Sequence, residues 1–336
     1  MDRAERNIHR RLTVATPKFV FFNGKIVPYE DAKVGVMTHA LNYGTAVFGG
    51  VRAYWNKDEH QLFVFRPYDH YKRFLDSMKI MRMKSDFTKE DLTKSTLELL
   101  GKHQYEEDCY IRPLAFFSDE IIGVRLHNLT TSVSIAAIPF GRYVENEEGA
   151  HVTISSWQRV SDNIIPARGK IAGSYVNSAF AKTDAQLAGF DEAIVLNNSG
   201  HVSEGSAENI IMVRNGTFVT PSITESILEG IVRRTFITLI QEELGMQVVE
   251  RSIDRTELFL ADELFFVGTG VQLTAITRID SRPIGEGKMG PLTTRLREMF
   301  FDTVRGKMPK YRHWCVPVYA KDAKERASSL NHVHER

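Results

Sequence analysis

The sequence feature that most constrains this chain is the stretch from Ile165 to Asn209, IPARGKIAGSYVNSAFAKTDAQLAGFDEAIVLNNSGHVSEGSAEN. Lys170 lies in a short loop of small residues, and the pattern of residues 174–187 predicts a helix after it. Residues 191–196 (DEAIVL) predict a buried strand. Glu204 follows Lys170 by 34 positions. One helix and one strand are enough to fold this stretch back on itself, so we expect the lysine amine and the carboxylate to lie close together.

An amine that can form an imine and a carboxylate that can hold a protonated ring nitrogen are what pyridoxal phosphate (PLP) requires from a protein. Lys170 is the candidate for forming the imine and for moving a proton at the substrate Cα. Glu204 is the candidate for the ring nitrogen, because an opposing carboxylate raises the pKa of that nitrogen. A single lysine or glutamate is usually a solvated surface residue, so this pair needs support from further motifs.

Length and charge set the limits for the rest of the chain. The 336 residues suit two domains, and 43 Lys+Arg against 42 Asp+Glu leave a formal charge of +1, which gives no electrostatic case for nucleic acid or a membrane surface. Cys109 and Cys315 form no metal-type spacing, so we expect a reducing compartment and no metal. The four arginines of residues 1–17 suggest a transit peptide, but Asp2 and Glu5 argue against it. The expected location is the cytoplasm.

The rest of the sequence predicts alternating strands and helices. Asn-Gly pairs predict hairpin turns within residues 18–28 and at 215–216. The expected strands are 51–55, 62–66, 109–117, 132–140, 151–157, 247–253 and 263–267. One expected helix begins at residue 67, and others span 88–102, 230–244 and 291–305. The charged run VENEEGA after Tyr143 is the best candidate boundary. We therefore predict a small substrate-side domain (1–143), a linker (144–150), a large PLP-binding domain (151–319) and a poorly ordered tail (320–336).

Two glycine-containing segments are suited to binding a phosphate. A phosphate dianion favours backbone N–H groups at a helix N-terminus, hydroxyl groups and an arginine. Gly230-Ile231-Val232 opens an expected helix, and Gly268-Thr269-Gly270 follows an expected strand. The second segment is not a dinucleotide fingerprint, because no third glycine follows at the required spacing.

The central stretch resembles the core of the branched-chain amino-acid aminotransferases, PLP-dependent enzymes of fold type IV. The matching pieces are KIAGSY (170–175), SEG (203–205) and Glu208-Asn209, and further motifs agree in order over roughly residues 18–319. The resemblance implies an α+β, two-domain fold of the D-amino-acid aminotransferase-like type.

The resemblance also implies which residues bind pyridoxal 5'-phosphate. Arg73 matches the family's phosphate arginine, and Tyr175 matches the tyrosine that hydrogen-bonds the ring oxygen. Val232 stands where the family more often has threonine, so one hydroxyl contact is lost while the backbone N–H remains. Whether Glu208 acts as an acid or is structural stays open. The implied cofactor-binding set is Arg73, Lys170, Tyr175, Glu204, Glu208, Asn209, Gly230, Ile231, Val232 and Thr269.

On the substrate side, the resemblance implies a pocket for small amino acids and 2-oxo acids. Tyr43 and Val124 match positions that reach across a dimer interface, which implies a homodimer or a multiple of dimers with the active site at that interface. The implied substrate-binding set is Phe48, Gly50, Arg52, Tyr110, Arg112, Tyr143, Thr269, Gly270, Tyr43, Val124 and Arg125.

Two departures from the family pattern affect the specificity of the pocket. Gly49 stands where the family has an acidic residue, and Arg125-Leu126-His127 stand where it has small polar and proline residues. Arg125 is a candidate for the distal carboxylate of glutamate or 2-oxoglutarate, or it lies in solvent. Arg52 is the competing candidate for that carboxylate.

The resemblance implies PLP-dependent transamination between branched-chain L-amino acids (Leu, Ile, Val) and 2-oxoglutarate. Alternatives with the same fold are an (R)-amine or D-amino-acid transaminase and an aminodeoxychorismate lyase. Tyr110 and Arg112 favour the branched-chain type, while Gly49 and Arg125 keep the amine transaminase open. A catalytically silent PLP-binding or regulatory protein has no need of the intact set Lys170, Tyr175, Glu204 and Thr269.

Overall fold

The computed structural model of the chain describes residues 16–141 and 149–320. Within these ranges the helices are α2 (His39–Tyr43), α3 (Pro67–Ile80), α4 (Lys89–His103), α5 (Tyr175–Leu187), α6 (Ile231–Glu243) and α7 (Pro291–Val304). The strands are β1 (Phe19–Phe22), β2 (Lys25–Pro28), β3 (Ala46–Phe48), β4 (Val51–Asn56), β5 (Gln61–Phe65), β6 (Cys109–Phe117), β7 (Thr131–Pro139), β8 (Ala150–Gln158), β9 (Glu192–Leu196), β10 (Val202–Gly205), β11 (Asn209–Arg214), β12 (Thr217–Thr220), β13 (Val248–Glu250), β14 (Glu263–Gly268), β15 (Gln272–Ile279), β16 (Arg282–Pro283) and β17 (Cys315–Pro317).

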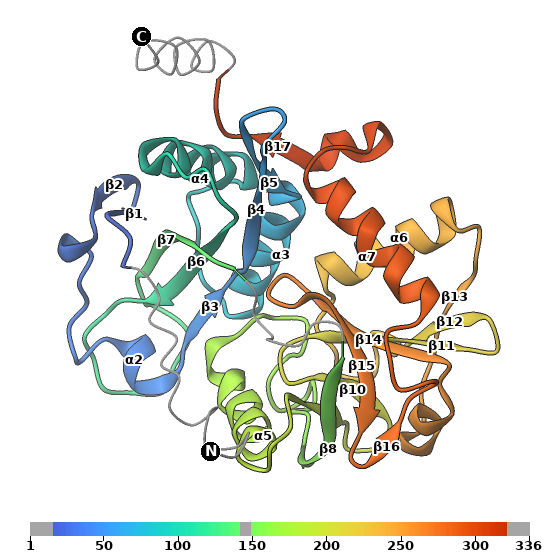
Figure 1. Cartoon of the computed structure of the whole chain (residues 1–336). Helices are drawn as coiled ribbons and strands as arrows, with labels where there is room; N and C mark the ends of the chain where they lie inside the picture. The colour runs from blue at the N-terminus through green and yellow to red at the C-terminus, as the bar shows by residue number, and fades with distance from the viewer. Residues whose placement is uncertain (1–15, 142–148, 321–336) are drawn as a thin grey trace, which may run out of the picture.

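The strands form two separate sheets (Figure 1). In the described residues the first has eight strands in the order β17-β5-β4-β6-β7-β1-β2, with β3 paired to β6. Its strand pairs are all antiparallel, and α3 and α4 pack against it. Apolar side chains such as Leu62, Phe74 and Ile111 fill the space between the sheet and these helices. Their burial is the main stabilising term for this half of the molecule.

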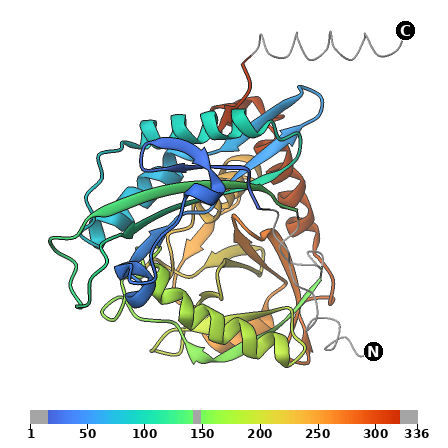
Figure 2. The ribbon, with the colours of Figure 1, turned by 90° about the vertical axis from the view of Figure 1, so that its left-hand side faces the viewer.

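Three helices of the described residues pack against the second sheet. Its nine described strands run β10-β9-β8-β15-β14-β11-β12-β13, with β16 paired to β15. Helix α5 packs on β8 and β9, whereas α6 and α7 pack together on β14. Phe236, Phe265 and Phe300 meet where α6 and α7 pack on β14, and all three are fully buried. Figure 2 shows α5 along the lower edge of the molecule, on the side opposite α3 and α4.

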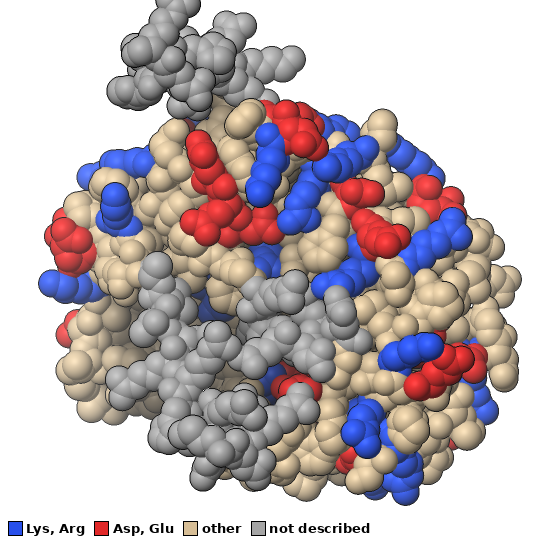
Figure 3. All heavy atoms as spheres, in the orientation of Figure 1, with Lys and Arg blue, Asp and Glu red and all other residues tan. Residues whose placement is uncertain are grey.

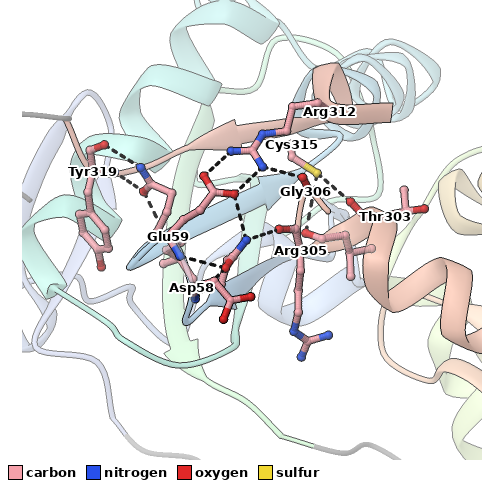
Figure 4. Close-up of polar contacts among 12 residues, drawn as sticks. Asp58, Glu59, Thr303, Arg305, Gly306, Arg312, Cys315 and Tyr319 are labelled. Atoms are coloured by element: carbon pink, nitrogen blue, oxygen red, sulfur yellow. Dashed lines mark hydrogen bonds and ion pairs between the residues drawn. The ribbon is translucent and has the colours of Figure 1, made fainter. Parts of the chain in front are cut away.

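The end of the chain returns to the first sheet. After α7, residues 305–319, here called the C-terminal strap, cross over and place β17 antiparallel to β5 (Figure 1). Polar contacts fix the strap to the loop after β4, and Figure 4 shows Arg312 turned toward Glu59. The predicted domain boundaries assign these residues to the large domain, although β17 contributes to the sheet of the small one. The boundaries themselves stay a prediction.

Local sequence signals correctly predicted several boundaries. Both Asn-Gly hairpins form, with positive φ at Asn23 (46°) and Gly24 (90°) and at Asn215 (49°) and Gly216 (71°). A capping box at Thr88 begins α4, and a proline opens α3 and α7. These elements were predictable because each depends on residues only a few positions apart.

Other parts of the fold were not predicted. No strand was predicted for β3, β10, β15 or β17, and no helix for α2. Residues 203–209 are an acidic segment of small residues for which no strand was predicted, yet Glu204 lies in the buried strand β10, where Arg159 pairs with it. This strand depends on tertiary contacts, because its sequence does not alternate between apolar and polar residues. Tyr143, the predicted linker and the predicted tail fall almost entirely in 142–148 and 321–336, outside the described residues.

Charges of both signs are interspersed over the face shown in Figure 3, in keeping with the formal charge of +1. In the part of the chain that the structure describes, no helix combines the length and apolar character needed to cross a membrane.

Candidate active site

A cavity of about 750 Å³ is lined by residues of both sheets. This volume lies within the range of about 300–1,000 Å³ that is usual for small-molecule sites. The predicted site residues on its wall are Phe48, Gly50, Arg73, Tyr110, Arg112, Lys170, Tyr175, Glu204, Glu208, Asn209, Gly230, Ile231, Val232, Thr269 and Gly270. The structure places Tyr43, Arg52, Val124 and Arg125 elsewhere, and Tyr143 is not described.

The loop that carries Lys170 belongs to the second half of the chain but is fixed to the first. The Lys170 N–H donates to Ser77 Oγ at 3.1 Å, and the Phe48 N–H donates to the Lys170 carbonyl at 3.0 Å. The Gly173 N–H donates to the Gly44 carbonyl at 3.2 Å. A Cβ on Gly44 would lie 3.0 Å from the Gly173 Cα, so the small residues after Lys170 permit this approach. The lysine backbone is therefore held on both sides.

The side-chain amine of Lys170 is buried and lies near positively charged side chains. Its Nζ donates to the Tyr175 hydroxyl at 2.5 Å. Burial lowers the pKa of Lys170 to about 7, with Arg73 adding to the effect and Glu204 opposing it. An amine with this pKa is substantially neutral at physiological pH, which a nucleophile or a proton acceptor requires.

The carboxylate of Glu204 is held by three donors. Its Oε1 accepts from the Arg159 guanidinium at 2.8 Å, and its Oε2 accepts from Asn209 Nδ2 at 2.9 Å and from the Leu228 N–H at 3.1 Å. Burial raises the pKa of Glu204, while Arg159 opposes that rise. Sequence reasoning missed Arg159, which directly follows the last residue of β8. A basic residue at the end of a buried strand was the available signal.

The next residues of this segment are equally buried. Glu208 is 4% exposed, and its Oε2 accepts from the Ala207 N–H at 3.0 Å. In the described part of the chain, the Glu208 Oε1 has no hydrogen-bond partner. Asn209 requires a glycine beside it, because a Cβ on Gly230 would lie 2.0 Å from the Asn209 Oδ1. The Glu208 carboxyl group is therefore only partly satisfied by hydrogen bonds.

One end of the cavity is suited to an anion. Helix α6 begins here, and residues 230–232 on the wall bring its first N–H groups, which have no partner within the helix. Arg73 reaches the same wall from α3 and donates to the Glu229 carbonyl at 3.1 Å. Burial lowers the pKa of Arg73, so an anion here relieves a desolvated cation. Thr269, which also lines the cavity, is a source of a hydroxyl.

The wall from the first sheet is mostly apolar. Phe48, Leu114, Ile138 and Phe140 line it together with Tyr110 and Arg112. The Arg112 guanidinium donates to the Tyr110 hydroxyl at 3.1 Å and lies 4.7 Å from the centre of the Phe48 ring. This arrangement gives the wall one cation and one hydroxyl within an apolar surface.

Two adjacent glycines leave room for that wall. A Cβ on Gly50 would lie 2.2 Å from the Tyr110 hydroxyl. A Cβ on Gly49 would lie 2.6 Å from the Pro113 Cγ. The absence of an acidic residue at position 49 therefore has a physical reason in this chain, since the proline ring occupies the space.

The remaining predicted substrate residues do not face this cavity. Arg52 is 2% exposed and donates to the carbonyls of Phe140 (2.9 Å), Gly141 and Gly270 (3.4 Å). Its guanidinium thus holds the backbone around the cavity instead of facing a ligand. The Tyr43 hydroxyl accepts the Gly123 N–H at 3.1 Å, which positions the loop bearing Val124 and Arg125. Both of those side chains are exposed.

A family model and known proteins match this chain over most of its length. A model of the family described as Amino-transferase class IV matches residues 46–279. A probable branched-chain-amino-acid aminotransferase of Aquifex aeolicus is 48% identical over 90% of this chain and 97% of its own length. The branched-chain-amino-acid aminotransferase of Escherichia coli K12 is 38% identical, over 90% and 98%.

Solved structures give the same result. The branched-chain aminotransferase of Thermoproteus uzoniensis with norvaline is 44% identical, has a TM-score of 0.86, and matches over 90% of this chain and 100% of its own. The PLP form of the Thermobaculum terrenum enzyme is 38% identical, with a TM-score of 0.87 over 90% and 99%.

This chain is a class IV aminotransferase of fold type IV. Within that class it belongs to the branched-chain-amino-acid aminotransferase family, which confirms the predicted family and fold. Class IV aminotransferases depend on pyridoxal 5'-phosphate, so the predicted cofactor is confirmed as well. The residues present fit that cofactor, because an amine, a carboxylate held by three donors and an anion-binding end share one cavity.

Proposed function

We propose that this enzyme transfers amino groups between branched-chain L-amino acids and 2-oxoglutarate, giving branched 2-oxo acids and L-glutamate. The observation that carries the proposal is the buried Lys170 amine, with its pKa lowered to about 7, on the same cavity as Glu204 and an apolar wall. A free amine at that position is suited to moving a proton at the substrate Cα.

Each cofactor-binding residue has a distinct task in this proposal. When bound, pyridoxal 5'-phosphate supplies the electron sink for charge that develops at the substrate Cα. Glu204 would hold the ring nitrogen protonated, and Tyr175 orients the Lys170 amine through the hydrogen bond to its hydroxyl. Arg73, Thr269 and the N-terminus of α6 hold the phosphate.

The substrate side chain lies against the first sheet in this proposal. Leu114, Ile138 and Phe140 offer apolar surface to a branched chain, and burial of such a side chain is worth about 1.5–3 kcal/mol. Tyr110 and Arg112 supply the polar contacts for the carboxylate.

We also propose that the enzyme is a homodimer or a multiple of dimers, with the active site at the interface. Support comes from large apolar side chains exposed on two adjoining loops, which are joined by the bridge between Thr38 and Glu120. They are Val34, Val36, Met37, Leu41, Ile122 and Val124. An apolar patch of this kind marks an interaction surface, and a second copy of the chain is the expected partner. Light scattering after size-exclusion chromatography tests this, and a monomer at micromolar concentration contradicts it.

Two buried free cysteines, Cys109 and Cys315, support a location in the reducing cytoplasm.

A donor screen tests the proposed specificity. L-Valine, D-alanine and (R)-1-phenylethylamine are each supplied with 2-oxoglutarate, and L-glutamate formation is measured. We expect turnover with L-valine to exceed the other two. Faster turnover with (R)-1-phenylethylamine would instead support the amine transaminase, the candidate that Gly49 and Arg125 keep open.

A further inference from the structure

Two buried glutamates, Glu204 and Glu208, line the same cavity from neighbouring positions, but their surroundings differ. Both oxygens of Glu204 accept hydrogen bonds, and one of the donors is the guanidinium of Arg159. An arginine cannot lose its proton in a protein, so this pair is stable only when Glu204 is ionised.

Glu208 has much weaker support for a negative charge. One backbone N–H, that of Ala207, donates to its Oε2, and its Oε1 is buried without a hydrogen-bond partner among the described residues. A buried carboxylate oxygen with no donor carries a large desolvation penalty. The neutral acid avoids this penalty, because burying an uncharged carboxyl group costs far less than burying a charge.

The neighbouring charges reinforce this difference. Glu192 of β9 is fully buried and takes the ammonium of Lys182 from α5 as its partner, and Lys182 also donates to the Asp191 carbonyl at 3.1 Å. Glu192 raises the pKa of Glu208, as Glu204 of β10 does more weakly, whereas Lys182 lowers it. One ammonium therefore faces two buried carboxyl groups, Glu192 and Glu208.

From these contacts we propose that Glu208 is held as the neutral acid, while Glu204 is held as the carboxylate. Glu204 would then be the single negative charge that this acidic pair offers to the ring nitrogen, and Glu208 is a positioning residue that completes the cavity wall without adding charge. Pairs of acids whose surroundings separate their protonation states in this way are typical of catalytic sites. The inference rests on the proposed cofactor cavity but not on the identity of the amino donor.

The proposal has a consequence for stability. Burial raises the pKa of Glu208 from 4.5 to about 8, with Glu192 adding to the effect. Between these two pH values the folded protein keeps a proton that the unfolded chain has released, so stability falls as the pH rises through that window. A group that cannot ionise at position 208 removes this fall.

The test compares Glu208→Gln with the wild-type holoenzyme and uses Glu204→Gln as the matched control. Glutamine has the shape of the neutral acid and cannot ionise. We expect the Tm values of wild type and Glu208→Gln to coincide near pH 4.5 and to separate as the pH approaches 8, with the variant higher. Glu204→Gln should lower Tm throughout and should still show Tm falling as the pH approaches 8, because Glu208 remains able to ionise. A constant difference between wild type and Glu208→Gln would overturn the proposal.

Infrared spectroscopy provides a second measurement that does not depend on how the variants fold. Wild-type holoenzyme with ¹³C-carboxyl glutamate should show an isotope-shifted carboxylic-acid band at neutral pH that disappears above the pKa of about 8. Where Glu208→Gln folds, the band should be missing. The absence of the band from wild type, or its survival in Glu208→Gln, would each overturn the assignment. The donor screen is independent of both results, so failure of this inference leaves the proposed reaction intact.

Discussion

In the cavity, the Lys170 amine loses basicity because burial outweighs the carboxylate near it, and its pKa falls to about 7. In the C-terminal strap, Lys310 gains basicity, because hydrogen bonds to Glu243 and Glu242 on α6 raise its pKa. Arg112 in the cavity has no carboxylate partner among the described residues, whereas Arg312 in the strap meets both oxygens of Glu59 at 2.7 and 2.6 Å (Figure 4).

The comparison distinguishes polar groups that are available to bind a ligand, in the cavity, from polar groups that stabilise the fold, in the strap. Polar atoms of the strap find partners within the protein, including the Gly306 carbonyl for Arg312 and the paired amide contacts between Gln61 and Tyr319. The cavity keeps cations and an orphaned oxygen away from solvent, which costs stability and suits the recognition of an anionic cofactor. Substitutions in the cavity should therefore change binding and turnover, and substitutions in the strap should change stability.

The largest effect is expected at Lys170. Lys170→Ala should lower turnover by several orders of magnitude, because the variant lacks both the nucleophile and the proton acceptor. Borohydride treatment of the wild type should attach the cofactor covalently to the peptide that contains Lys170. The matched control is Lys72→Ala, since Lys72 pairs with Asp76 at the surface and should be dispensable. Label on Lys182 or another lysine contradicts the assignment.

A smaller effect is expected at Arg73. Arg73→Ala should weaken cofactor affinity by roughly ten- to a hundredfold, since a charge-assisted contact to phosphate is worth about 1.5–3 kcal/mol. The rate at saturating cofactor should change far less. Arg295→Ala is the control, because Arg295 is an exposed residue of α7. An unchanged dissociation constant measured by fluorescence titration would make Arg73 a structural residue of α3.

The sequence predicted the residues of the cavity better than the contacts of the strap. Lys170, Glu204 and Arg73 each lie in a recognisable sequence motif, and in the structure all three line one cavity. The pairing of Arg159 with Glu204 was not predicted, because these residues meet only after β8, β9 and β10 assemble. Strand register, unlike a turn or a helix cap, depends on residues far apart in the chain.

The strap was missed for the same reason. Glu59 and Arg312 are 253 positions apart, and neither lies in a motif. For Arg52 the family match suggests a ligand role, which stays a prediction, whereas the structure shows its side chain turned toward backbone carbonyls. A motif predicts that a residue is near the site but not which way its side chain points.

A further prediction concerns Arg125, an exposed residue that we expect to contact substrate as the cavity residues do. The γ-carboxylate of glutamate needs a cation in an otherwise apolar pocket, and Arg125 can reach a partner's pocket only if the proposed dimer forms. Arg125→Ala should lower catalytic efficiency with L-glutamate or 2-oxoglutarate by about tenfold, equivalent to ~1.4 kcal/mol, and change it little with L-leucine. Equal losses with both substrates would assign Arg125 to the loop or the interface, and no loss would place it in solvent.

The smallest effect is expected in the strap, at Arg312. Arg312→Ala should lower the free energy of unfolding by about 1 kcal/mol, the upper end for a solvent-exposed ion pair, because the contact to Glu59 is bidentate while both side chains are more than a third exposed. Cofactor affinity and the KM for L-leucine should stay unchanged, since Arg312 does not line the cavity. Lys288→Ala is the control, because its pair with Glu286 is 74% and 79% exposed and should contribute almost nothing. Denaturant titration gives the stability, and steady-state kinetics on the same samples gives KM. A raised KM with unchanged stability would place the strap on the functional side of the comparison.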